Sequence, residues 1–123
     1  MREIAIAVAC VLSAGAAAAE LIEVKLAPGT VIDKRLVVAA GKFAELCSPL
    51  KQGQVVLWKF GADAASDFNI HYHVGKKVEY PEQRTNTREA DGRLVIGVEQ
   101  DYCWMWTNRT GSPMTVDVTL KAK

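Results

Sequence analysis

Short segments in which apolar and polar residues alternate constrain this chain more than any other feature of its sequence. Apolar side chains occupy every second position in residues 22–26, 68–74 and 114–120. A period of two is typical of β-strands that bury one face, whereas an amphipathic helix needs a period near 3.6. No segment after residue 19 shows the helical period, and turn residues separate the alternating segments. The sequence therefore predicts an all-β domain.

The spacing of these segments predicts about eight short strands in an antiparallel β-sandwich, with a jelly-roll or immunoglobulin-like topology. A length of 123 residues allows one domain. Residues 61–67 and 82–90 are predicted loops, because they consist mainly of small or polar residues. Residues 75–77 and the Asp91-Gly92 pair are predicted hairpin turns.

The first nineteen residues differ in character from the rest of the chain. An apolar run over residues 4–12 is followed by a tract of alanines, and residues 17–19 satisfy the small-x-small cleavage rule. We therefore expect residues 1–19 to be a cleaved signal peptide and residues 20–123 to form a domain in the periplasm or outside the cell. The alternative is a retained membrane anchor, but about fifteen apolar residues are fewer than the roughly 20 that a span needs. No membrane span is expected in the mature chain.

Export determines how the cysteines are interpreted. Cleavage removes Cys10 and leaves Cys47 and Cys103. An even number of cysteines in an exported protein predicts a disulfide, because compartments outside the cytoplasm are oxidising. The alternative is two free thiols in a reducing cell, which requires that residues 1–19 are not a signal peptide.

Three segments in the second half of the chain carry a family resemblance. They are residues 52–60 (QGQVVLWKF), 67–70 (DFNI) and 101–108 (DYCWMWTN). In this order and spacing they resemble the GOLD (Golgi-dynamics) domain, the β-sandwich of the lumenal part of early-secretory-pathway transmembrane cargo receptors. Tyr102, Trp106 and Asn108 occupy matching places. The resemblance implies a GOLD-like β-sandwich after the signal peptide.

Two departures limit what this resemblance implies. Met105 stands where the cargo receptors have their second disulfide cysteine, and Cys103 lies two residues earlier. A shift of two residues keeps the same face of a strand, so Cys103 is still expected to reach Cys47 at the place of the family's first cysteine. The coiled coil, membrane span and sorting tail of the receptors do not follow residue 120. We expect a stand-alone exported version, without a role in cargo sorting.

His71 and His73 have a spacing that suits a shared metal ion. Two residues apart on a strand, they project from one face roughly 6.5–7 Å apart, which is close enough to share copper or zinc. Both imidazoles are expected at the surface. The alternative to a metal site is that they belong to a solvated polar face that binds no metal. Candidates for a further ligand are Met105, Met114, Glu79 and Glu99. A blue-copper site is excluded, because no histidine follows Cys103.

The segment of residues 102–107 is the most aromatic in the chain and is apolar on both faces. Trp104 and Trp106 share one face, while Cys103 and Met105 share the other. An exposed aromatic face is typical of a binding platform, so both tryptophans are candidate partner-binding residues. The alternative is a central strand with both faces covered.

The charge balance and the absence of catalytic motifs narrow the function. With 15 Lys plus Arg and 14 Asp plus Glu, the chain offers no basic field for nucleic acid or an anionic membrane. No nucleophile elbow, metalloprotease motif, phosphate loop or dinucleotide fingerprint occurs. We therefore expect a non-enzymatic, cofactor-free module that binds a protein, or alternatively a small ligand. The alternative function is a periplasmic or secreted copper- or zinc-binding protein that uses His71 and His73.

Overall fold

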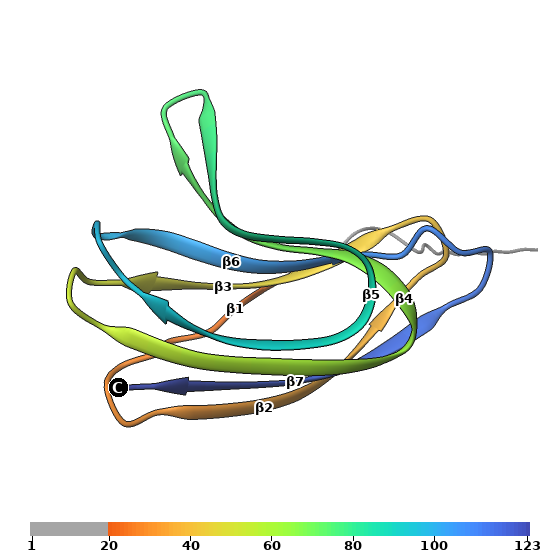
Figure 1. Ribbon diagram of the computed structural model, residues 1–123, viewed down its shortest axis with the longest axis horizontal. Coiled ribbons are helices and arrows are strands. Elements are labelled where there is room, and N and C mark those ends of the chain that lie inside the picture. Colours follow the sequence, from red (N-terminus) through yellow and green to blue (C-terminus); the bar gives the residue numbers. More distant parts are fainter. Residues whose placement is uncertain (1–19) are drawn as a thin grey trace, which may run out of the picture.

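A computed structural model describes residues 20–123 (Figure 1). The predicted signal peptide, residues 1–19, lies outside the described residues and stays a prediction. Residues 20–123 contain strands and turns but no helix, and therefore none that could cross a bilayer, so the all-β prediction is confirmed. The strands are β1 (Glu20–Glu23), β2 (Val31–Val38), β3 (Phe43–Leu50), β4 (Val55–Val74), β5 (Lys77–Val95), β6 (Gln100–Thr107) and β7 (Met114–Ala122).

The long strand β4 connects two layers of one strongly curled sheet. The strand order is β1-β3-β6-β4-β7-β2, and β5 also pairs with β4. Residues 56–62 of β4 pair with β7, whereas residues 67–71 pair with β6. One layer therefore contains β7 and β2, and the other contains β6, β3 and β1, as Figure 1 shows.

The strand pairs are antiparallel with one exception. β1 and β3 run parallel, and Glu20 of β1 lies beside Ala44 of β3. The remaining strand pairs are antiparallel, in agreement with the predicted sandwich. Here β2 follows β1 in the chain but lies in the other layer, so the chain returns to β3 by a crossover and runs in the direction of β1.

An aromatic core fills the space between the layers. Trp104 and Trp106 of β6 are both 0 % exposed. The Trp106 ring centroid lies 5.5 Å from that of Phe60 and 5.4 Å from that of Phe68. The prediction of an exposed platform at Trp104 and Trp106 is therefore wrong, because β6 is a central strand and turns this face towards the opposite layer.

β4 and β5 extend through both segments that the sequence predicts as loops, residues 61–67 and 82–90. The register between β4 and β5 shifts between Gly61 and Ser66 and again between Ser66 and Phe68. Such bulges bend a strand, and here they carry β4 from one layer to the other. β5 pairs only with β4, and its largely exposed surface accommodates polar side chains.

Gly92 lies inside β5, opposite Trp58, rather than in the predicted hairpin turn. The indole of Trp58 is 3 % exposed and packs directly against this glycine. A Cβ atom at position 92 would lie 2.6 Å from Cζ2 of Trp58, which is too close for a real contact. Glycine is therefore required here by the close approach of the ring.

We expect Gly92→Ala to destabilise the domain by about 1–3 kcal/mol, because the added methyl group must displace the Trp58 ring within a packed core. Gly61→Ala is the matched control, since a Cβ there meets no atom within 4 Å. Urea unfolding of both variants measures the free energy of unfolding. Equal stabilities of the two variants would contradict this account of Gly92.

Candidate functional site

The predicted disulfide between Cys47 and Cys103 is present, with an S–S distance of 2.10 Å. It joins directly opposed residues of β3 and β6, whose Cα atoms lie 4.1 Å apart. Such close opposition is a feature of the non-hydrogen-bonded pairs in an antiparallel ladder. The neighbouring residues Leu46 and Trp104 point into the core, so the bridge lies on the outer face of its layer.

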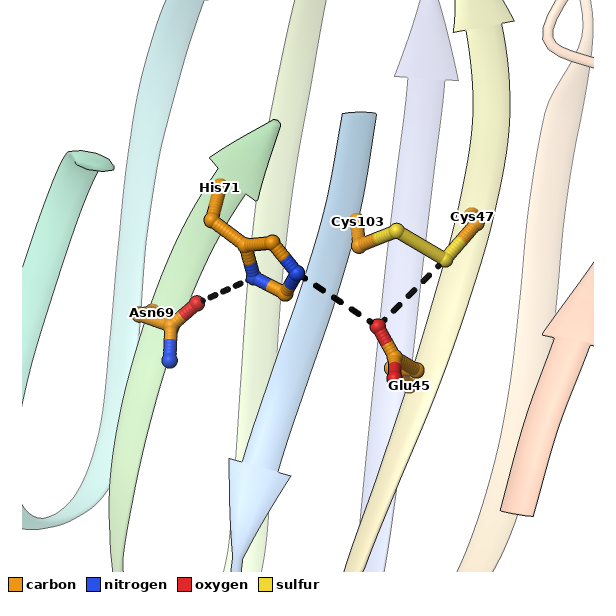
Figure 2. The surroundings of a disulfide bond; sticks show 5 residues. All are labelled: Glu45, Cys47, Asn69, His71 and Cys103. Atoms are coloured by element: carbon orange, nitrogen blue, oxygen red, sulfur yellow. Dashed lines mark hydrogen bonds and ion pairs between the residues drawn. A yellow bond between two sulfur atoms is a disulfide. The ribbon is translucent and has the colours of Figure 1, made fainter. Parts of the chain in front are cut away.

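Three adjacent strands bring polar side chains to the bridge on this outer face. Cys103 of β6 lies opposite Cys47 of β3 on one side and opposite His71 of β4 on the other. Glu45 and Asn69 occupy the next row of the same face, two residues along their strands. Figure 2 shows Glu45 and His71 pointing towards each other beside the disulfide. We call Glu45, Cys47, His71 and Cys103 the bridge cluster.

The distances within the bridge cluster are short. Nδ1–H of His71 donates to Oδ1 of Asn69 over 2.7 Å, which leaves Nε2 facing the cluster. That Nε2 lies 3.7 Å from Oε1 of Glu45. The same Oε1 lies 3.5 Å from Sγ of Cys47, a contact rather than a hydrogen bond because a bridged sulfur carries no proton.

Burial determines the ionisation of the two titratable members. The side chains of Glu45 and His71 are 11 % and 8 % exposed. Burial raises the pKa of Glu45, with an opposing effect from His73 and a further increase from Asp101. Burial also lowers the pKa of His71, and the nearby His73 lowers it further. Both shifts favour the neutral form of the side chain.

The two histidines that the sequence predicts as a surface pair lie close together but differ in exposure. His71 is only 6 % exposed, so its predicted surface position is wrong. Its ring lies among those of His73 and Tyr80, at centroid distances of 5.3 and 6.0 Å. His73 is exposed. Within residues 20–123, the one group of three potential metal ligands within mutual reach is Glu45, His71 and Cys103, without His73.

The four further ligands suggested from the sequence have different surroundings. Met114 is 0 % exposed and belongs to the core. Glu79 and Glu99 are exposed, and Met105 lies in the row of Glu45. Glu45 is not among the residues singled out from the sequence, because only the pairing of β6 with both β3 and β4 brings it near His71. The available signal was its position two residues before Cys47, on the same strand face.

A second surface feature is the end of the β4–β5 hairpin, which projects from the body of the sheet in Figure 1. Its turn contains the predicted Gly75, whose φ of 61° suits glycine. Val74 beside the turn and Tyr80 further along β5 are each 47 % exposed. At the base of the hairpin, Tyr72 packs against Tyr102 of β6 with ring centroids 4.9 Å apart. The hairpin therefore presents apolar surface on an anchored support.

This chain is similar in fold to solved structures of known proteins. No family model matches the chain, and no curated protein sequence is significantly similar to it. Similar solved structures are all-β domains, which agrees with the strands described above.

Three of these structures are of PliG, a periplasmic inhibitor of g-type lysozyme. The Salmonella Typhimurium protein matches with a TM-score of 0.58 and 12 % identity, over 85 % of this chain and 98 % of that one. The Aeromonas hydrophila protein has a TM-score of 0.57 and 14 % identity, over 85 % and 100 % of the chains. A mutant of the Escherichia coli protein gives 0.53 and 14 % over the same shares. Identities this low show a shared fold, and the GOLD resemblance stays a prediction.

We expect the bridge to contribute roughly 4 kcal/mol to stability on the chain-entropy model, since it closes a loop with a sequence separation of 56. The double variant Cys47→Ala/Cys103→Ala should lose about this amount in guanidinium unfolding. Thiol titration of the unreduced, denatured domain should find no thiol at either position. Two reactive thiols in residues 20–123 would contradict the bridge.

Glu45 should make the domain less stable as pH rises. Because its pKa is raised in the folded chain, the unfolded chain releases the proton first, and stability falls between the ordinary value of 4.5 and the raised value. Glu45→Gln removes this loss, so the stability of the variant relative to wild type should increase from pH 4 to pH 7.

His71 acts in the opposite direction, since its lowered pKa reduces stability as pH falls below 6.5. The comparison of Glu45→Gln with wild type keeps His71 in both proteins, so the loss that burial of the Glu45 carboxyl group causes is the main difference between their profiles. Glu79→Gln, at an exposed position of β5, is the control. Urea unfolding across this pH range tests the expectation, and parallel stability profiles for wild type and Glu45→Gln would refute it.

Proposed function

We propose that this chain is an exported, non-enzymatic protein-binding module whose partner is a lysozyme. The disulfide between Cys47 and Cys103 supports export, because such bridges persist in oxidising compartments. The likeness to PliG supports the type of partner, since it covers 85 % of this chain and all of the Aeromonas hydrophila protein. The likeness is one of fold, so the proposal depends on a surface that this chain itself provides.

The projecting end of the β4–β5 hairpin is the observation that carries the proposal. Val74 beside the turn and Tyr80 further along β5, each 47 % exposed, offer an aliphatic and an aromatic contact on this hairpin. Tyrosine is enriched among the residues that contribute most to protein–protein binding. Paired strands and the contact between Tyr72 and Tyr102 hold the hairpin in place. A preorganised element loses little conformational entropy on binding.

The chemistry of the bridge cluster supports binding rather than catalysis. Both cysteine sulfurs are bonded to each other, so neither is available as a nucleophile. His71 is hydrogen-bonded to Asn69 and buried.

On the other layer, the outer groove along β2 and β7 contains the exposed ion pair of Arg35 and Asp117, at 2.7 Å. Solvated ion pairs of this kind are common on protein surfaces.

Metal binding by His71 and His73 has less support in the geometry. His71 is buried and His73 is exposed, and the group of three potential ligands within mutual reach among residues 20–123 leaves out His73. The pair therefore stays an alternative prediction.

The test is a titration of g-type lysozyme with the domain, measuring lysis of a cell-wall suspension. Wild type should inhibit the enzyme stoichiometrically. Tyr80→Ala should weaken inhibition at least about tenfold, the effect of losing roughly 1.4 kcal/mol of binding free energy at one interface residue. Val74→Ser should weaken it in the same direction.

Val95→Ser is the matched control, because Val95 is 56 % exposed on the same strand as Tyr80 but lies far along β5 from the hairpin end. It should inhibit as wild type does. Failure of wild type to bind or inhibit any lysozyme would overturn the proposed partner. Inhibition that Tyr80→Ala and Val74→Ser leave unchanged would overturn the role of the hairpin.

A further inference from the structure

The bridge cluster contains four donor atoms of the kinds that bind zinc. Two of them, the cysteine sulfurs, are bonded to each other in the disulfide. The donor atoms of Glu45, His71 and Cys103 all lie within 4.8 Å of one another. Sγ of Cys47 is bonded to Cys103 and lies 3.5 Å from Oε1 of Glu45. Two thiolates, an imidazole and a carboxylate are ligand types that zinc uses in tetrahedral coordination. Figure 2 shows these four side chains converging from β3, β6 and β4.

The separations agree with those of ligands around one ion. Tetrahedral bonds of about 2.1 Å to nitrogen and oxygen and about 2.3 Å to sulfur place N and O about 3.4 Å apart, and O and S about 3.6 Å apart. Nε2 of His71 and Oε1 of Glu45 are 3.7 Å apart. Oε1 and Sγ of Cys47 are 3.5 Å apart. The two sulfurs, 2.10 Å apart, must separate to about 3.8 Å, while the donor atoms of Glu45, His71 and Cys103 already lie within 4.8 Å of one another.

Asn69 prepares His71 for this role. Its Oδ1 accepts the proton of Nδ1, so the lone pair of Nε2 is directed at Glu45 and the sulfurs. A polar partner on the distal nitrogen is the usual arrangement behind a metal-bound histidine, because it determines the tautomer and the ring orientation. The hydrogen bond of 2.7 Å therefore orients the histidine before any ion arrives.

We propose that reduction of the disulfide converts the bridge cluster into a zinc site with Cys47, Cys103, His71 and Glu45 as ligands. The reductant is a dithiol, which gives up two electrons and two protons and becomes a disulfide. The Cys47–Cys103 bond takes up both electrons and both protons and becomes two thiols. Zn²⁺ then displaces the two thiol protons to solvent and binds both thiolates. In the oxidised chain only Glu45 and His71 remain as ligands, and binding is weak.

The zinc site and the proposed lysozyme contact use different residues, although the rings of Tyr80 and His71 are neighbours with centroids 6.0 Å apart, and zinc titrations test the first without any lysozyme. Such a site would couple the redox state of the two cysteines to the stability of the domain. Reduction removes the chain-entropy stabilisation of the bridge, and zinc bound to the folded chain restores stability by an amount that rises with the logarithm of the zinc concentration.

The experiment compares the oxidised and the reduced domain, freed of reductant under anaerobic conditions, in titrations with Zn²⁺ followed by calorimetry. The reduced domain should bind one Zn²⁺ roughly 100-fold more tightly than the oxidised one. Co²⁺ in place of Zn²⁺ should give thiolate-to-cobalt charge-transfer absorption in the reduced domain only. His71→Ala and Glu45→Gln should each weaken binding to the reduced domain by at least about tenfold.

His73→Ala is the matched control, since it removes an exposed imidazole two residues along β4 and should leave the affinity unchanged. Equal binding before and after reduction would overturn the proposal, as would binding that His73→Ala abolishes. Binding that His71→Ala leaves intact would show two thiolates acting alone and would also overturn it. Tryptophan fluorescence reports folding, and a reduced domain that stays unfolded in Zn²⁺ would contradict a site in the folded chain.

Discussion

β4 belongs to both layers of the sheet, and the rest of the structure depends on that. Its first part pairs with β7 and its second part with β6, so the two layers cannot separate without breaking one continuous strand. The register shifts around Ser66 make the bend, and Phe60 and Phe68 on either side of it face each other with ring centroids 4.7 Å apart. The aromatic core is thus assembled where one strand changes layer.

The two faces of β6 show how a single strand serves stability and the candidate site together. Trp104 and Trp106 fill the core, while Cys103 on the opposite face holds the bridge. The core position has a cost, because Nε1 of both tryptophans has no hydrogen-bond partner among residues 20–123. An unpaired buried donor costs about 1–3 kcal/mol. The large apolar area of each indole and the disulfide behind it offset this cost.

The bridge and the hairpin place two different kinds of chemistry on one strand pair. His71 lies where β4 is still paired with β6, and is buried. A few residues later β4 has left β6 and pairs with β5 alone, and Val74 is exposed there. Tyr80 is exposed on β5, which pairs with no strand other than β4. The change from buried polar cluster to projecting apolar surface follows from the number of neighbouring strands, not from a change in composition.

The sequence by itself determined the all-β class, the strands at residues 68–74 and 114–120, and the pairing of Cys47 with Cys103. Each of these follows either from the local alternation of apolar and polar residues or from the number of cysteines. Neither signal depends on tertiary contacts. Only the tertiary structure decided that the polar residues 82–90 form a strand, because an edge strand beside β4 tolerates exposed polar side chains. Only it decided that Trp104 and Trp106 are buried and that Glu45 meets His71. Alternation shows which residues share a face, but strand order and register determine what covers that face, and these depend on residues far apart in the chain.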